Sequence, residues 1–170
     1  LGTGIIVTAA RAELIATEDL EYALATMATL NKEAAAAMND TGASACTDIT
    51  GFGLLGHAYE MATASGVTIE INTSAVPLLP ATLNAASMGL IPAGAYRNRD
   101  HFSPHVRTGD EIDATFLLTL YDPQTAGGLL IAVPPEKETA FVAACRQRNV
   151  NAVRIGRVLP RIEEWAIIIT

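Results

Sequence analysis

Hydrophobic and polar positions alternate along this chain in short runs, and these runs predict an ordered series of strands and helices. Alternating or continuous apolar runs indicate strands, whereas apolar residues at three- and four-residue steps indicate helices. We expect strands over residues 2–10, 43–49, 67–71, 129–133, 153–159 and 165–169. We expect helices over residues 18–39, 54–65, 80–88, 110–120 and 135–149. This order of elements predicts an α+β fold in which a mixed β-sheet is packed with helices.

One long helix and one long loop account for much of the predicted order of elements. The helix over residues 18–39 is indicated by apolar residues that recur on one face, namely Leu20, Leu24, Met27, Leu30 and Ala34. Gly66 and Gly89 follow two shorter helices, in the position that a helix C-terminus favours. Residues 90–110 show little periodicity, so we expect a loop of about twenty residues, longer than the ~12 to 15 of an ordinary connection. Loops of this length often cover active sites.

Composition places the chain among folded globular domains. Half of its 170 residues are hydrophobic, so it can bury one sizeable core, and we expect residues 1–170 to form a single domain. Lys and Arg total 11, the net charge is −7 and the basic residues are scattered. These features argue against binding to nucleic acid. Anionic ligands would need a metal ion or a local group of backbone amides.

The sequence predicts neither a membrane segment nor an export signal. The longest apolar stretch, residues 116–133, is interrupted by Asp122 and Pro123 and by a glycine pair. The first residues lack the basic region and cleavage pattern of a signal peptide. The two cysteines, Cys46 and Cys145, are too few for a disulfide framework and lack metal-ligand spacing. We therefore expect a cytoplasmic protein whose two cysteines are reduced residues of the core.

An acidic residue followed by three glycines stands between the strand predicted at 43–49 and the helix predicted at 54–65. This arrangement suits a phosphate that arrives with magnesium. Asp48 could hold the metal ion through one carboxylate oxygen. The hydroxyls of Thr47 and Thr50 and the free amides at the start of the helix would then face the phosphate.

Two other interpretations of this segment stay open from its residues alone. The glycines between residues 51 and 56 have the G-x-G-x-x-G spacing of a dinucleotide-binding turn, and Glu70 lies where a ribose-binding acid is expected. Against NAD, Asp48 would repel a pyrophosphate by roughly 4 kcal/mol at close range. The simpler interpretation is that Thr50 or Asp48 caps the helix and that the glycines permit close packing. The segment by itself favours this simpler interpretation.

Three segments that occur together and in order favour a functional interpretation over the simpler one. They are Thr47-Asp-Ile-Thr-Gly-Phe-Gly-Leu-Leu-Gly-His57, Ile91-Pro-Ala-Gly-Ala-Tyr-Arg-Asn98 and Asp122-Pro-Gln-Thr-Ala-Gly-Gly-Leu-Leu-Ile-Ala-Val133. In this combination the chain resembles the C-terminal domain of the selenophosphate synthetase (selenide, water dikinase) family. That family is part of the aminoimidazole ribonucleotide synthetase superfamily, which also contains thiamine monophosphate kinase. The resemblance implies the α+β fold of the superfamily's C-terminal domain.

The resemblance also implies an activity and a set of site residues. It implies an enzyme that uses ATP, selenide and water to make selenophosphate, AMP and phosphate, with Mg²⁺ and a monovalent cation. It implies that Asp48 reaches across a domain interface to help bind the metal ion on the nucleotide phosphates. Arg97 and Asn98 match the family's Arg-Asn pair, so we expect them to contact a phosphate or a product oxyanion, or else to tether the loop. The residues expected on the nucleotide side are Thr47, Thr50, Gly51, Gly53, Arg97 and Asn98.

The chain also departs from the family's pattern. The nucleophilic cysteine or selenocysteine and the ATP ligands belong to an N-terminal half that this sequence does not contain, and Cys46 does not match the nucleophile. We therefore expect a C-terminal domain that has no catalytic residue, is inactive alone, and pairs with its own N-terminal ATP-binding domain in a homodimeric full-length protein. Ala126 replaces the family's usual serine. Another ATP-dependent synthetase or kinase of the superfamily, and a non-catalytic relative, remain alternatives.

Overall fold

The computed structural model describes residues 1–109 and 111–170, which form eight α-helices, six β-strands and three short 3-10 helices. The α-helices are α1 (Thr3–Arg11), α2 (Thr17–Ala28), α3 (Lys32–Thr41), α4 (Gly53–Ser65), α5 (Thr82–Ser87), α6 (Ala93–Phe102), α7 (Ala114–Thr119) and α8 (Glu138–Gln147). The strands are β1 (Ala45–Asp48), β2 (Val67–Ile71), β3 (Val106–Thr108), β4 (Leu129–Ala132), β5 (Gly156–Pro160) and β6 (Ile167–Ile169). The 3-10 helices are η1 (Thr73–Ala75), η2 (Ser103–His105) and η3 (Pro135–Lys137).

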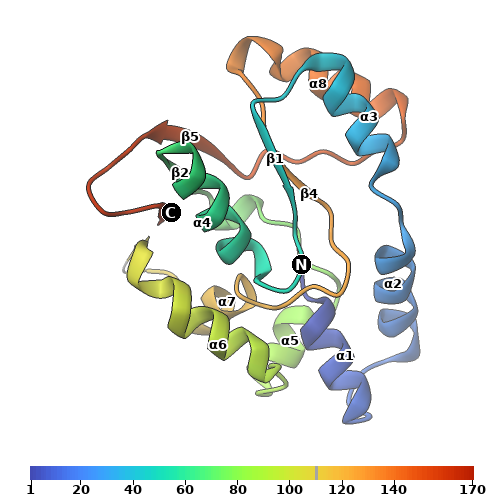
Figure 1. Ribbon diagram of the computed structural model, residues 1–170. Coiled ribbons are helices and arrows are strands. Elements are labelled where there is room, and N and C mark those ends of the chain that lie inside the picture. Colours follow the sequence, from blue (N-terminus) through green and yellow to red (C-terminus); the bar gives the residue numbers. More distant parts are fainter. Residues whose placement is uncertain (110) are drawn as a thin grey trace.

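The described strands form two separate sheets. One has four strands in the order β3-β6-β2-β5, with β2 antiparallel to β5 and parallel to β6, and with β3 parallel to β6. The other is the antiparallel pair of β1 and β4, in which Asp48 lies opposite Leu129. In Figure 1 this pair runs through the middle of the molecule, with α3 and α8 side by side at one end. The prediction of an α+β fold with a mixed sheet is confirmed.

Helix α4 joins the two sheets through the main core. It packs on β2 and β6 of the larger sheet and also on β1 of the smaller one. Leu55 and Ala58 of α4 are fully buried, and they share one cluster with Ile71, Ile167 and other sheet residues. The helix ends at Gly66, whose φ of 65° is left-handed, as the sequence predicts. The residues after Asp48 are therefore held by the best-packed helix of the fold.

The first predicted strand is wrong, because residues 3–11 form helix α1 instead. Ile5, Ile6 and Ala9 are completely buried, so the segment is apolar on nearly every side. A short apolar run of this kind does not distinguish a buried helix from a buried strand. The helix is selected by partners far along the chain, which accept hydrogen bonds from the amides of its first turn.

The single long helix predicted over residues 18–39 is also wrong. The structure has α2 and α3, separated at Thr29, whose backbone is extended with a ψ of 124°. Asn31 donates a hydrogen bond from its side chain to the Gly127 carbonyl over 2.9 Å. This contact turns the chain so that α3 lies along α8. Leu30 is consequently 79% exposed, although the periodicity predicts it on the buried face.

The loop predicted over residues 90–110 is largely helix and strand, although its last residue lies outside the described part of the chain. Helix α6, η2 and β3 fill most of it. The helix escaped prediction because it is polar, with only Ala95 and Phe102 buried along its ten residues. The prediction of a loop is therefore wrong: α6 packs on α4 and β3 pairs with β6.

The other predicted elements are present with shifted boundaries. Helix α7 begins at Ala114 because the Asp113 carboxylate accepts a hydrogen bond from the Phe116 amide over 2.8 Å and so caps the helix there. The predicted start of that helix, residue 110, lies outside the described residues. Among the helices that the structure describes, none combines the length and the apolar content that crossing a membrane requires.

Two buried polar side chains hold the start of α1. The side-chain oxygen of Gln124 accepts hydrogen bonds from the amides of Gly2 and Thr3 at 3.1 and 3.2 Å. The Asp122 carboxylate accepts one from the Gly4 amide at 3.0 Å and another from the Gln124 side chain at 2.9 Å. Asp122 is fully buried, and its second carboxylate oxygen has no partner among the described residues. Burial therefore raises the pKa of Asp122 to about 6, despite the hydrogen bonds that favour its charged form.

This pKa predicts an unusual pH dependence for stability. Between about pH 4 and pH 6 the folded state binds a proton on Asp122 that the unfolded state has released, so this contribution to stability falls as the pH rises. The difference from the ordinary pKa corresponds to about 3 kcal/mol. The free energy of unfolding of the wild type, measured in urea relative to Asp122→Asn, should therefore fall by about this amount between pH 4 and pH 7. Asp113→Asn, on the exposed cap of α7, is the matched control, and an unchanged difference between wild type and Asp122→Asn across this range would contradict the prediction.

Candidate functional site

The proposed metal ligand lies on an open surface. Along β1 the side chains alternate, so that Cys46 and Asp48 are exposed whereas Ala45 and Thr47 are half-buried. Asp48 is the last residue of the strand, directly before the glycine turn that leads into α4. A partner or a ligand can therefore reach its carboxylate without any rearrangement of the core.

The turn after Asp48 is fixed by its own backbone. Ile49 is buried, and its amide donates a hydrogen bond to the Gly128 carbonyl over 2.9 Å. The Thr50 carbonyl accepts hydrogen bonds from the amides of Gly53 at 3.0 Å and Gln124 at 2.9 Å. The turn is thereby bound to the Asp-Pro-Gln-Thr segment, which also caps α1.

The two glycines that were predicted to face a phosphate have different surroundings. Gly53 is buried with a left-handed φ of +70°, and a Cβ atom there would lie 2.7 Å from the Tyr121 carbonyl carbon. Gly51 is exposed, has no left-handed φ, and would accept a Cβ with nothing within 4 Å. Gly53 therefore permits the close approach of another backbone, whereas Gly51 is open to a ligand.

The first amides of α4 are less available to a phosphate than the sequence suggests. Three of them already have acceptors, since Gly53 donates to the Thr50 carbonyl, Leu55 to the Leu120 carbonyl and Phe52 to the His57 ring. Leu54, Leu55 and Gly56 are also buried. The helix start is thus built for packing, and the residues exposed around it are Asp48, Gly51 and Phe52.

The Arg-Asn pair lies on α6, beside the same turn. The Asn98 side-chain nitrogen donates hydrogen bonds to the carbonyls of Gly51 at 2.9 Å and Tyr121 at 3.0 Å. It therefore tethers the turn, which is the second of the two roles expected for it. Arg97 is exposed, and in the described part of the chain its guanidinium makes no hydrogen bond or ion pair, whereas the guanidinium of Arg99 is bound to Asp100 at 2.7 Å.

The chain supplies too few ligands to hold a metal ion alone. Within residues 1–109 and 111–170, no three His, Cys, Asp or Glu side chains form a group that could bind one. Cys46, on the same face as Asp48, is exposed rather than in the core as expected, while Cys145 is buried. Partial desolvation of the sulfur, and then the Asp48 carboxylate, raise the pKa of Cys46, so its reactive thiolate form is disfavoured.

The NAD-binding alternative is wrong. A dinucleotide-binding unit needs consecutive parallel strands in one sheet around the glycine turn. Here β1 and β2 belong to different sheets, and β1 is antiparallel to its only neighbour among the described strands. Glu70 is not free for a ribose, because both of its carboxylate oxygens accept hydrogen bonds from Arg157 at 2.9 and 3.1 Å.

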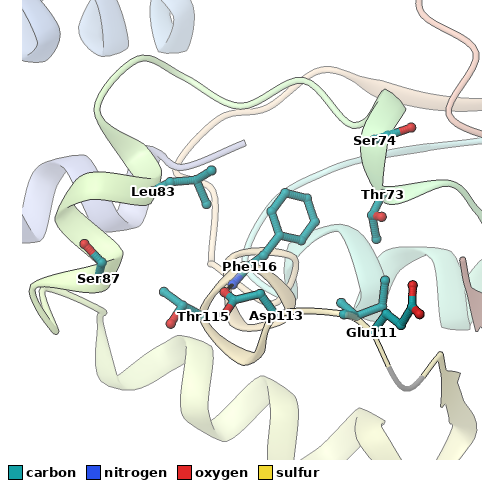
Figure 2. A pocket seen from close by; sticks show the side chains of 9 residues that line it. Thr73, Ser74, Leu83, Ser87, Glu111, Asp113, Thr115 and Phe116 are labelled. Atoms are coloured by element: carbon teal, nitrogen blue, oxygen red, sulfur yellow. Dashed lines mark hydrogen bonds between the residues drawn. The ribbon is translucent and has the colours of Figure 1, made fainter.

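Hollows on the surface do not coincide with this turn. The larger of two candidates has a volume of about 500 Å³ and lies among η1, α5 and α7, with Phe116 and Asp113 on its wall (Figure 2). None of the predicted site residues lines it. The smaller, of about 280 Å³, is lined by residues 38, 39 and 42–46, so it includes Cys46 but not Asp48. The predicted site residues therefore lie on an exposed turn and not in either of these two hollows.

Sequence reasoning missed three residues that shape the turn. The sequence pattern assigns His57 no function, whereas in the structure it contacts both Thr50 and Phe52. Asp122 and Gln124 belonged to a motif that supported the resemblance, but their buried bonds to α1 were not predicted. A signal for them was present, because acidic and amide side chains within an otherwise apolar stretch usually have specific hydrogen-bond partners.

Comparison with known proteins agrees with this architecture. Residues 1–165 match the family described as "AIR synthase related protein, C-terminal domain". A selenide, water dikinase from Geobacter metallireducens is 48% identical over 168 residues, covering 99% of this chain and 49% of the relative. One from Trichlorobacter lovleyi is 46% identical over 169 residues, with the same coverage of 99% and 49%. One from Caldanaerobacter subterraneus subsp. tengcongensis is 46% identical over 164 residues, covering 96% and 47%.

The two-sheet α+β fold and the exposed acidic turn define the class as that of the AIR-synthase-related C-terminal domains. This chain belongs to that family. Its similar relatives are named selenide, water dikinase, and the chain spans about half the length of these relatives.

Substitution of the two turn glycines should separate packing from ligand access. Gly53→Ala places a Cβ against the Tyr121 backbone in a left-handed conformation, and we expect a loss of at least about 2 kcal/mol in the free energy of unfolding. Gly51→Ala is the matched control and should change stability by less than about 0.5 kcal/mol, because its Cβ meets open space. Urea denaturation of the two variants measures both values. Equal stability of the two variants would show that the close approach at Gly53 is not a constraint.

Proposed function

We propose that this chain is the C-terminal domain of a selenide, water dikinase, which makes selenophosphate from selenide, ATP and water and releases AMP and phosphate. The observation that carries the proposal is the exposed carboxylate of Asp48, at the rim of a rigid turn. The support from comparison is that relatives with this name are up to 48% identical over almost the whole chain. The activity itself belongs to the full-length protein.

We assign to Asp48 the binding of Mg²⁺ that accompanies the nucleotide. Magnesium is commonly held by one or two carboxylates together with phosphate oxygens and water. One exposed carboxylate, which belongs to no group of three or more His, Cys, Asp or Glu side chains among the described residues, fits such a shared site and not a closed protein cage. Phosphoryl transfer depends mainly on positioning and on neutralisation of charge, and bound magnesium would supply the neutralising charge.

We assign the contact with a phosphate or product oxyanion to Arg97. Both hydrogens of the Asn98 side-chain amide are already donated to backbone carbonyls, so Asn98 has none left for an anion. The guanidinium of Arg97 is exposed and suits the paired oxygens of a phosphate. Thr47, Thr50 and the open backbone at Gly51 complete the surface that we place toward the nucleotide.

The remaining components lie outside this chain. We propose that the N-terminal half of the same protein covers the Asp48 surface and supplies the nucleophile and the other ATP ligands. This proposal is supported by the length of the relatives, of which the chain accounts for about half. We further propose a homodimeric full-length protein in the cytoplasm that also uses a monovalent cation, and we expect the domain to be inactive alone.

The metal role can be tested in the full-length protein by Asp48→Asn. We expect AMP formation with selenide to fall by at least about 100-fold at low millimolar magnesium, because the amide cannot neutralise the cation. Cys46→Ser, on the same face of β1, is the matched control and should keep full activity. Thiamine monophosphate in place of selenide tests the alternative substrate class. Undiminished AMP formation by Asp48→Asn, with the same magnesium requirement, would falsify the assignment.

The two arginines of α6 offer a second comparison. Arg97→Ala should raise the KM for ATP or lower kcat by at least about tenfold, because it removes a charged contact to an oxyanion. Arg99→Ala should have little effect, since Arg99 is bound to the neighbouring Asp100. Steady-state kinetics of the full-length variants measure both parameters. If Arg99→Ala is the more damaging change, the anion contact has been assigned to the wrong residue.

A further inference from the structure

His57 lies in the first turns of α4 and is directed back at the turn that precedes the helix. Its Nε2 atom is 3.1 Å from the Thr50 hydroxyl oxygen and accepts a hydrogen bond from the Phe52 amide at 3.4 Å. The residue is only 8% exposed, and its ring centroid is 5.3 Å from that of Phe52. A buried imidazole is costly unless its polar atoms are paired. These contacts therefore fix both the ring and the turn.

The Phe52 amide decides which form of the ring is present. A backbone amide can only donate, so the Nε2 atom that it meets must carry a lone pair and no hydrogen. In this arrangement the hydrogen of the ring lies on Nδ1. Because Nε2 has no hydrogen to give, the hydroxyl of Thr50 must donate its own hydrogen to His57.

This hydrogen bond determines what Thr50 can offer to a ligand. With its hydrogen directed at His57, the hydroxyl oxygen presents lone pairs on its other side. It can accept a hydrogen bond or act as a ligand to a cation, but it has no hydrogen left for a phosphate. The expectation that Thr50 faces the phosphate as a donor therefore changes, and its oxygen is a neutral acceptor two residues after Asp48 in the sequence.

We propose that His57 is a positioning residue for the cation site beside Asp48, an inference that rests on the function proposed above. By holding the Thr50 hydrogen, His57 leaves an oxygen of the kind that Mg²⁺ prefers. By accepting from the Phe52 amide, it also keeps the exposed turn in one conformation. Residues that orient metal ligands in this way commonly affect metal affinity by about 10- to 100-fold.

The experiment compares His57→Leu with His57→Gln in the full-length protein. The carboxamide of glutamine can place an oxygen near the Nε2 position and accept both hydrogen bonds, whereas leucine can accept neither. Two quantities are measured: the MgCl₂ concentration for half-maximal AMP formation, and the rate of hydrogen exchange in the peptide that contains Phe52. For His57→Leu we expect both to rise by at least about tenfold, and for His57→Gln both should stay within about threefold of wild type.

Further variants keep the test decisive. If His57→Leu does not fold, Thr50→Val replaces it in the test. Thr50→Val lacks the hydroxyl and should raise the magnesium concentration needed for half-maximal activity, whereas Thr50→Ser keeps the hydroxyl and should need the same concentration as wild type. His101→Leu, an exposed histidine on α6, is the matched control for loss of an imidazole and should change neither quantity. The inference is overturned if His57→Gln is as impaired as His57→Leu, or if neither His57→Leu nor Thr50→Val changes the magnesium requirement.

Asp48→Asn distinguishes this inference from the proposed function. If Asp48→Asn leaves the magnesium requirement unchanged, the proposed metal role fails and the cation-positioning role of His57 fails with it. If Asp48→Asn raises the requirement while the His57 and Thr50 variants do not, only the role of His57 is overturned. Exchange at Phe52 reports the contact with His57 in either case, because it does not depend on catalysis.

Discussion

The close approach of two backbones, the glycine turn before α4 and the segment around Tyr121, organises this structure. A Cβ at Gly53 would lie 2.7 Å from the Tyr121 carbonyl carbon, so no larger residue fits without a shift. Hydrogen bonds join the same segments, from Leu55 to the Leu120 carbonyl at 3.2 Å and from Gln124 to the Thr50 carbonyl at 2.9 Å. Asn98 bridges them from α6, because its side chain donates to both backbones. Three parts of the chain that are distant in sequence are thereby fixed around one turn.

This arrangement separates residues that build the scaffold from residues that can act on a ligand. Asp122 and Gln124 resemble site residues in the sequence, but they are buried and their polar atoms hold the start of α1. A charged carboxylate at Asp122 is costly near neutral pH, since burial raises its pKa to about 6. Its two hydrogen bonds, to Gly4 and Gln124, offset part of that cost. Asp48, in contrast to Asp122, is exposed at the end of β1, where a second domain could reach its carboxylate.

Elements with strong local signals were predictable, and elements selected by distant contacts were not. Helix α4 and strand β2 follow from apolar periodicity and from Gly66, which ends the helix in a left-handed conformation. Helix α1 is apolar enough to suit a strand, and it is held as a helix by acceptors from residues 122–124 and by packing on α2 and α5. The break between α2 and α3 depends on the bond from Asn31 to Gly127, and no local pattern contains that information. At the site, the exposure of Asp48 agrees with the sequence hypothesis, whereas the role of His57 required the geometry.

Electrostatics favours a metal ion between the Asp48 carboxylate and the polyphosphate ligand that we propose for this surface. The chain carries a net charge of −7, and Asp48 places an exposed carboxylate at the turn, so a polyphosphate without a cation is repelled from this side chain. A cation already bound to the phosphates reverses the sign of that interaction, because it places positive charge between two anions. One carboxylate and one hydroxyl oxygen are too few to hold magnesium in water, where the ion keeps most of its own ligands. Under the function proposed above, metal and nucleotide would arrive together from the other half of the protein, and Asp48 would complete the site only when the two halves close on each other.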